Sequence, residues 1–532
     1  MNNANQSDFY LLKNKQLTKL FSVLPNKTHF FEYPVFSFSF GYDGKTWIYD
    51  KNEKNVTKVS DEIGGKTESN QLKESQRWYI GTERGLLCVF LNGFKNFTRT
   101  EVPYAWGVVE DEKKHIWITN FQASLQKFDG KNLQTITQHE PIIAKSLKES
   151  EVENGKGSIN SWYFNPLRDK YGKLWFSRLT GALIIDKNKF EYFNPKSDRV
   201  FFLNIAEDKK RNKILGCGSG GLAIIDNKLP YKFKIITDTS TLFQRPRYIL
   251  TAAVDSVGNY WLGGRNIVKY NPDKKTFDYY TDWNKKLFKA GVANLTFDSR
   301  GGLWAGTSNE ELAKYNPKTD KFEAVFEQYL KDKPTYFLGQ ISEKYFAVGD
   351  DLNIYIIDLD ALYKSKHEKV VKVLNYHNGF MGIEPAQNGL YKASDGKIWV
   401  CSGTVLSYFD PKQINFNEAP LRTYIRKIND YRLPFNYENI APIELEEDKN
   451  EVRINVESVG EDKSANAQFS YRINGFKESW SSWQTDRTIY LTNMPSGVFT
   501  IEVRSQRSNI FSENHPVTKL KFKVNIRFWK SV

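Results

Sequence analysis

The sequence has 532 residues, more than one ordinary hydrophobic core serves, so we expect several domains or an array of repeats. Aromatic residues make up 15% of the chain, and this composition favours strands over helices. The formal net charge is +14, but the lysines are scattered through turns instead of forming a stripe, which argues against a nucleic-acid partner. Three widely spaced cysteines argue against a disulfide framework and a zinc cluster.

A repeated motif dominates the first four fifths of the chain. Its clearest copies run from Asp255 to Trp261 and from Asp298 to Trp304, each with an Asp, a glycine turn and then an apolar strand around Trp. The Asp can bond its own backbone and the Gly can take positive φ, so the motif predicts a tight turn that leads into a buried strand. About nine centres recur, at Trp47, Trp78, Trp117, Trp175, Leu215, Trp261, Trp304, Phe346 and Trp399.

A repeat of roughly forty residues built from strands predicts a β-propeller, and a β-solenoid would have a shorter period. We therefore expect a multi-bladed β-propeller of about eight to nine blades over residues 1–415, in which each Trp is a core residue. The longer intervals near residues 130–165 and 360–390 predict insertions between blades, in loops at one face of the disc.

Candidate binding residues follow from the blade pattern. Two loops of each blade should reach the same face of the disc: the loop after the strand with the central Trp, and the loop before the strand that leads into the Asp turn. Aromatic plates beside guanidinium groups suit an oligosaccharide with carboxylates or sulfates, whereas any one of these residues has a simple packing role as its alternative. The first loop set contributes Arg84, Asn120, Arg178, Arg265 and Asn309, and the second contributes Trp106, Trp162 and Arg247.

The sequence shows no catalytic, metal or cofactor motif. Six histidines lack metal-ligand spacing. The run Gly216–Gly221 matches Gly-x-Gly-x-x-Gly, but an apolar strand follows it where a dinucleotide site needs a helix. Adjacent carboxylates such as Asp350 and Asp351 point to opposite faces of a strand, so we interpret them as solvated turns. We expect no enzyme activity, no metal and no cofactor.

From residue 420 to 532 the repeat gives way to alternating strands that predict one immunoglobulin-like or fibronectin-like β-sandwich. Three pieces, Tyr471–Phe476, Trp480–Trp483 and Tyr490–Phe499, resemble the triple-tyrosine (Y_Y_Y) domain, with Phe499 at the third tyrosine position. Together with the Asp-turn-Trp repeats, the chain resembles the periplasmic sensor region of hybrid two-component system regulators. Those sensors typically have two seven-bladed propellers, so nine units predict one large propeller, or a closed one plus remnants.

The resemblance implies a periplasmic ligand-sensing ectodomain of a membrane-spanning transcription regulator. Its ligand would be an oligosaccharide, and its parent receptor a homodimer that signals through the sandwich. The positive charge and the arginines at positions 84, 178, 247 and 265 favour an anionic ligand over a neutral one. The aromatic and basic ending Ile526–Val532 resembles a lead-in to a membrane span. A lyase or glycosidase and a protein-interaction scaffold are the alternatives.

Overall fold

The computed structural model describes the strands between residues 7 and 90 by their backbone alone. It describes in addition residues 94–120, 125–137, 140–142, 162–178, 181–195, 201–236, 249–280, 291–307, 311–375, 379–414, 421–434, 437, 441–445, 451–459, 467–507 and 515–525. The chain divides into two compact units, Met1–Asn92 and Gly93–Val532.

The described strands of the first unit form three sheets. They are the pair β1 (Ser7–Lys13) and β2 (Gln16–Val23), the four-stranded sheet β3 (Thr28–Glu32), β4 (Phe36–Gly41), β5 (Thr46–Asp50) and β6 (Asn55–Ser60), and the three-stranded sheet β7 (Leu72–Glu74), β8 (Arg77–Thr82) and β9 (Gly85–Phe90).

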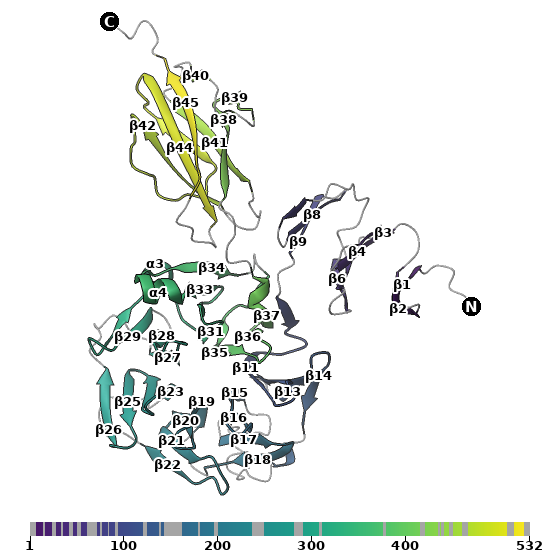
Figure 1. The fold of residues 1–532 in the computed structure, drawn as a ribbon, viewed down its shortest axis with the longest axis vertical. Helices are drawn as coiled ribbons and strands as arrows, with labels where there is room; N and C mark the ends of the chain where they lie inside the picture. Colours follow the sequence, from purple (N-terminus) through teal and green to yellow (C-terminus); the bar gives the residue numbers. More distant parts are fainter. Residues whose placement is uncertain are drawn as a thin grey trace. The chain divides into compact units, whose positions relative to one another are not determined.

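The second unit begins with a ring of seven four-stranded blades, which Figure 1 shows as a disc. Blade 1 has β11 (Ala105–Glu110), β12 (Ile116–Asn120), β13 (Leu125–Phe128) and β14 (Leu133–Ile136); blade 2 has β15 (Tyr163–Arg168), β16 (Leu174–Arg178), β17 (Gly181–Asp186) and β18 (Lys189–Phe193). Blade 3 has β19 (Phe201–Asp208), β20 (Lys213–Ser219), β21 (Gly221–Asp226) and β22 (Phe233–Ile236); blade 4 has β23 (Ile249–Val254), β24 (Tyr260–Gly264), β25 (Ile267–Asn271) and β26 (Thr276–Tyr280). Blade 5 has β27 (Val292–Phe297), β28 (Leu303–Thr307), β29 (Leu312–Asn316) and β30 (Lys321–Ala324); blade 6 has β31 (Phe337–Gln340), β32 (Tyr345–Gly349), β33 (Ile354–Asp358) and β34 (Val370–Leu374). Blade 7 has β35 (Pro385–Lys392), β36 (Ile398–Ser402) and β37 (Val405–Phe409), and β10 (Lys95–Thr98) completes it.

The early strand β10 closes the ring. It pairs antiparallel with β37, with Lys95 opposite Tyr408, so the last blade takes its outer strand from the start of the unit. The hydrophobic core of the ring is seven clusters, one at each interface between neighbouring blades, including the interface of blades 7 and 1. Because apolar burial is the main stabilising term, each blade depends on both neighbours.

The nine predicted centres lie on strands of nine different sheets. Seven of those sheets form the ring, and the sheets with Trp47 and Trp78 belong to the first unit. The ring is therefore smaller than the eight to nine blades that we expected, because seven sheets already close on themselves through β10. The outcome corresponds to the expected alternative of a closed propeller plus further repeat units.

The Asp of the motif holds the turn and the tryptophan together. Asp298 Oδ1 accepts hydrogen bonds from the backbone N–H groups of Arg300 and Gly302, both at 2.9 Å, and its Oδ2 accepts from Trp304 Nε1 at 2.7 Å. Trp304 is fully buried. The same carboxylate-to-indole bond recurs from Asp111, Asp169 and Asp255. The motif therefore closes a turn and fixes the core residue that follows it.

Short helical segments interrupt the strands of the second unit. Those with defined bounds among the described residues are α3 (Glu327–Leu330), α4 (Leu359–Ser365) and the 3-10 turn η3 (Pro411–Gln413). The helix α4 lies between the last two strands of blade 6, so the expected insertion near residues 360–390 does not lie in one loop at one face. It divides between α4 and the segment that precedes β35.

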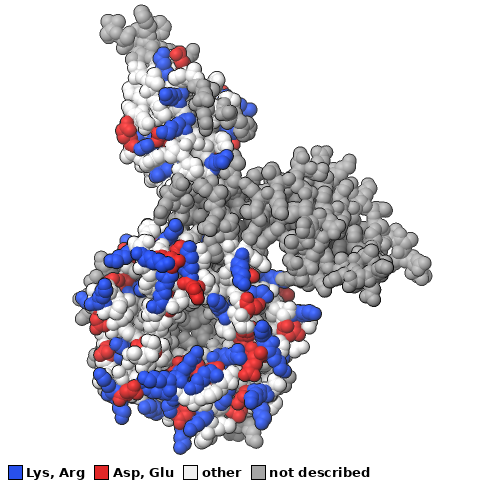
Figure 2. All heavy atoms as spheres, in the orientation of Figure 1, with Lys and Arg blue, Asp and Glu red and all other residues white. Residues whose placement is uncertain are grey.

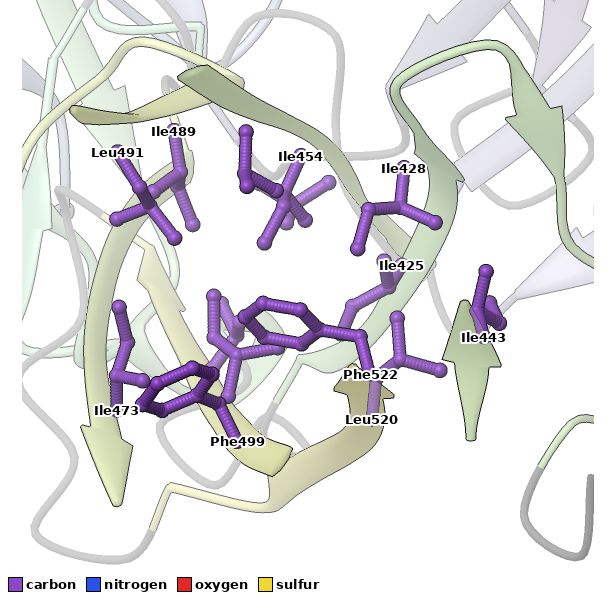
Figure 3. Packing of buried hydrophobic residues seen from close by; sticks show 14 of the residues in the cluster. Ile425, Ile428, Ile443, Ile454, Ile473, Ile489, Leu491, Phe499, Leu520 and Phe522 are labelled. Carbon is purple, nitrogen blue, oxygen red and sulfur yellow. The ribbon is translucent and has the colours of Figure 1, made fainter. Parts of the chain in front are cut away.

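The C-terminal strands form a sandwich of two four-stranded sheets. One sheet has the order β39 (Tyr431–Arg432), β38 (Arg422–Ile428), β41 (Glu451–Val459) and β43 (Thr488–Thr492), and the other has β40 (Ile443–Leu445), β45 (Val517–Val524), β44 (Gly497–Arg507) and β42 (Ala467–Asn474). One apolar cluster lies between the sheets, and Figure 3 shows its side chains pointing toward one another. Phe499 is buried in it with its ring centroid 5.8 Å from that of Phe522, so the aromatic packing of this position is kept.

Candidate functional site

The ring has two faces that differ in what they carry. The inner strands β11, β15, β19, β23, β27, β31 and β35 contact one another in sequence around the ring. The turns that join each inner strand to the next strand of its blade, most of which carry the Asp of the repeat, define the turn face. The opposite face, here the loop face, carries the connections between blades and between second and third strands. Ile398 directly follows the turn of blade 7, and it pairs with Phe409, the last residue of the ring. Lys95, the first residue of the ring, pairs with the adjacent Tyr408. The chain therefore enters and leaves the ring on the side of the turn face.

Strand register brings the described candidate residues to the loop face. Ala105 pairs with Asn120, Tyr163 pairs with Arg178, and Ile249 pairs with Gly264. Trp106 and Trp162 therefore adjoin the first two pairs, and Arg265 follows the third. The side chains of the other candidates, Arg84, Arg247 and Asn309, lie outside the described residues.

Three aromatic residues of blades 1 and 2 pack together at this face, and we call Trp106, Trp162 and Phe164 the aromatic cluster. The Phe164 ring lies edge-on to Trp106 at 5.4 Å and to Trp162 at 6.4 Å between ring centroids. Phe164 is buried, Trp106 is half-buried, and Trp162 is 41% exposed. β-Bulges follow Ala105 in β11 and Tyr163 in β15 and locally re-aim these side chains. The cluster offers an apolar aromatic edge to solvent.

Two candidates lie beneath the surface. Arg178 is fully buried, its Nη1 donates to Tyr163 Oη at 3.1 Å, and its guanidinium lies 4.6 Å from the Tyr163 ring centroid. Burial raises the pKa of Tyr163, so its hydroxyl stays protonated. Asn120 is also fully buried, and its Nδ2 donates to Gln126 Oε1 at 2.9 Å. These two side chains support the loop face from within, whereas Arg265 is exposed.

A wide bulge of β35 adds polar groups that sequence reasoning missed. The register of β35 against β36 shifts between Pro385 and Leu390. Within it, Gln387 Nε2 donates to Ala293 O at 2.7 Å, and the Asn388 N–H lies 2.9 Å from Tyr336 O and 3.1 Å from Asn294 Oδ1. The bulge thus links the inner strands of blades 5, 6 and 7. The Asn-Gly pair at 388–389 was the available signal, since Asn388 has φ 57°.

Exposed apolar side chains gather near blades 6 and 7. Leu352, Met381 and Ile383 are each about half exposed, and the Glu384 N–H donates to Asp351 O at 2.9 Å, which joins their two loops. Nothing in the sequence pattern singled out these residues, because isolated apolar residues in loops carry no periodic signal.

The carboxylate of Asp350 differs from our expectation of a solvated turn. It is buried and accepts from the Leu352 and Asn353 N–H groups and from Tyr355 Oη at 2.8 Å. Like the Asp of the repeat, it bonds two backbone N–H groups of its own turn and an aromatic side chain, but it lies in the loop between β32 and β33. Among the described residues, no group of three or more His, Cys, Asp or Glu side chains is placed to hold a metal ion. No helix in the described part of the chain has both the length and the apolar character needed to cross a membrane.

Known proteins resemble this chain in its C-terminal domain and in its fold. Residues 460–525 match the Y_Y_Y domain model. No curated protein matches the sequence. The crystal structure of the extracellular domain of the hybrid two component system BT3049 from B. thetaiotaomicron is similar over 98% of this chain and 70% of its own, with a TM-score of 0.71 and 16% identity. The corresponding domain of BT4673 from the same organism covers 93% of this chain and 68% of its own, with a TM-score of 0.47 and 14% identity.

Proposed function

Because residues 460–525 match the Y_Y_Y domain and the chain has the fold of the extracellular domain of a hybrid two component system, we propose that this chain is the periplasmic sensor ectodomain of such a regulator. In this role it binds a ligand and catalyses no reaction. A change in the arrangement of a homodimer then carries the signal through the sandwich. Such a relay requires that the ligand bind one arrangement more tightly than the other.

The loop face of the ring is the proposed ligand site. The observation that carries this proposal is the aromatic cluster, in which Trp162 presents 41% of its surface to solvent beside the half-buried Trp106. An exposed Trp that packs edge-on against a buried Phe164 is held in place, so a ring-shaped ligand can stack on it with little loss of conformational freedom. The loops between blades lie on this face, and binding residues concentrate in loops that a rigid scaffold holds in place.

We propose an oligosaccharide as the ligand, since aromatic edges flanked by amide and guanidinium donors suit sugar rings and their hydroxyl groups. The preference for an anionic oligosaccharide depends on the exposed Arg265 and on two arginines outside the described residues, because Arg178 is committed to Tyr163. Figure 2 shows Lys and Arg spread among Asp and Glu over the ring in this view.

Calorimetry with neutral and acidic oligosaccharides at two salt concentrations tests the charge of the ligand. Contacts to an exposed Arg265 should weaken at high salt, because free charges are screened beyond about 8 Å at physiological ionic strength. Arg265→Gln should reduce the affinity for an acidic oligosaccharide and leave a neutral one unchanged. Salt-independent binding of a neutral oligosaccharide alone would contradict the anionic preference and leave the sugar site standing.

A further inference from the structure

The propeller brings lysines that are scattered along the sequence to one part of the turn face. The hairpins between the third and fourth strands end on this face, because neighbouring strands run antiparallel. In blades 2, 3 and 4 each of these hairpins exposes two lysines, at positions 187 and 189, 228 and 232, and 274 and 275. The turns between the first and second strands add the exposed Lys170, Lys209 and Lys210. We call the turns and hairpins of blades 2 to 4 the basic turn surface.

Hydrogen bonds hold the turns of these blades side by side. Lys170 Nζ in the turn of blade 2 donates to Lys209 O in the turn of blade 3 at 2.8 Å. Lys210 Nζ in the turn of blade 3 donates in the same way to Val257 O in the turn of blade 4, at 3.3 Å. The turns of three consecutive blades therefore form one continuous surface, on which the lysines stand close to one another.

Exposed acidic side chains do not balance these lysines. Asp273 is the only exposed carboxylate in the turns and hairpins of the basic turn surface, all of which belong to the described residues. Arg211 donates to both of its oxygens, through Nε at 2.9 Å and through Nη2 at 2.5 Å. In blade 1, by contrast, Glu112 and Asp129 are exposed among the lysines of the corresponding turn and hairpin. The surplus of exposed positive charge is therefore a property of blades 2 to 4 and not of every turn in the repeat.

Large apolar side chains are exposed in the same turns. Tyr171 of blade 2 is 53% exposed, and Leu229 of blade 3 and Val257 of blade 4 are each 64% exposed. Among the described residues, the turns and hairpins of the other four blades expose no large apolar side chain. Lys170 Nζ lies 5.2 Å from the centroid of the Tyr171 ring, so apolar and basic side chains alternate on this surface. Exposed apolar side chains that gather within a polar surround mark an interaction surface.

The combination of charge and apolar side chains distinguishes between two kinds of anionic partner. A soluble acidic polymer would be bound by the lysines, and the exposed Leu229 and Val257 would add nothing to its binding. A bilayer with anionic lipids uses both kinds of side chain. Lysines attract the headgroups, while aliphatic side chains and Tyr enter the boundary between headgroups and acyl chains. The basic turn surface also lies on the side of the ring where the chain enters and leaves.

We propose that the basic turn surface docks the ring on a bilayer that contains anionic lipids. Tyr171, Leu229 and Val257 enter the interface, and the lysines around them contact the phosphate groups of the lipids. The loop face, on the opposite side of the disc, then stays open to a ligand. The docking does not depend on an oligosaccharide, so it can be tested whether or not the loop face binds a sugar.

Co-sedimentation of the full chain with vesicles, without oligosaccharide, tests this docking. The chain should bind vesicles of phosphatidylglycerol mixed with phosphatidylcholine more tightly than vesicles of phosphatidylcholine alone. Its affinity should fall as salt rises, because exposed charges are screened. Lys228→Gln combined with Lys274→Gln should weaken binding by about tenfold, since each lysine near an anionic surface adds to the attraction. The matched control is Lys318→Gln combined with Lys321→Gln, which removes two exposed lysines at the β29–β30 hairpin of blade 5 and should bind as the wild type does.

A second variant tests the apolar contacts. Leu229→Ser combined with Val257→Ser should weaken vesicle binding by about fivefold and leave the binding of dextran sulfate, a soluble polyanion, unchanged. Leu352→Ser, at an exposed position of the loop face, is its control and should bind vesicles as the wild type does. Three results would each overturn the proposal: equal binding to neutral and anionic vesicles, an equal loss in the blade 5 control, or full vesicle binding by the Leu229→Ser and Val257→Ser variant. The last result would assign the surface to a soluble polyanion.

Discussion

At the scale of single residues, one carboxylate organises the first turn in blades 1, 2, 4 and 5. Asp298 accepts from two backbone N–H groups, from Trp304 Nε1 and, at 2.5 Å, from Tyr363 Oη of the neighbouring blade. Asp298→Ala leaves these donors unpaired and should lower the free energy of unfolding by about 3 kcal/mol. Urea denaturation of the full chain measures this, with Asp278→Ala, an exposed Asp on β26, as the control. Equal midpoints for the two variants would contradict the account.

The sequence identified this Asp and the buried Trp, but it did not identify the bond between them. Local rules predict how Asp bonds its own backbone, whereas the indole partner depends on a tertiary position six residues on. The same limit explains Arg178. Its place after a central strand correctly predicted the loop face, yet only packing shows that it is buried and committed to Tyr163.

At the scale of elements, β10 decides whether the ring is closed. Phe97 on β10 lies 5.2 Å from Phe128 and 6.2 Å from Trp399 between ring centroids, so it bridges blades 1 and 7. Phe97→Ala should cost about 2 kcal/mol, at the low end for a half-buried aromatic residue. The control is Phe233→Ala on β22, an outer strand that closes nothing. An equal or smaller loss in Phe97→Ala would show that closure adds no stability.

The number of blades could not be predicted from the repeat alone. Counting centres gives nine units, but closure depends on which outer strand pairs with β37, and β10 carries no motif. Strand pairing over about three hundred residues of chain is a non-local property that periodicity does not encode.

The outer face of the β42–β44 sheet should make the sandwich sensitive to acid. Bonds from Lys519 and Arg472 lower the pKa of Glu502, so its contribution is present above its ordinary value of 4.5 and is lost as pH falls through that range. Burial and the charge of Arg504 lower the pKa of His515, whose ring lies 5.0 Å from that of Trp483. The folded chain therefore prefers neutral His515, and stability falls as pH drops below 6.5.

Urea unfolding at pH 7 and pH 5.5 separates the two groups. The urea midpoint of the wild-type chain should be lower at pH 5.5 than at pH 7. His515→Phe keeps a ring beside Trp483 but cannot titrate, so its midpoint should decrease less between the two pH values. Glu502 acts only at lower pH. A pH dependence that is identical in both proteins would remove His515 from the account.

At the scale of the whole molecule, we propose that the ligand binds at one face of the ring. The fold class and the Y_Y_Y domain could be predicted from the sequence, because the repeats indicate the propeller and three spaced motifs indicate the domain. For the candidate site, the sequence predicts only the face of the ring, because the positions of the loops follow from the blade pattern. No sequence pattern predicts that Leu352, Met381 and Ile383 are exposed.

The most direct test is calorimetry of the wild-type chain, Trp162→Ala and Tyr171→Ala against a panel of oligosaccharides. Tyr171 is a matched control, because it is an aromatic residue of blade 2 that is 53% exposed on the turn face. We expect the wild-type chain to bind, Trp162→Ala to lose about 2 kcal/mol of binding free energy, and Tyr171→Ala to bind as the wild type does. Binding that survives Trp162→Ala intact, or that Tyr171→Ala abolishes, would contradict a ligand site on the loop face.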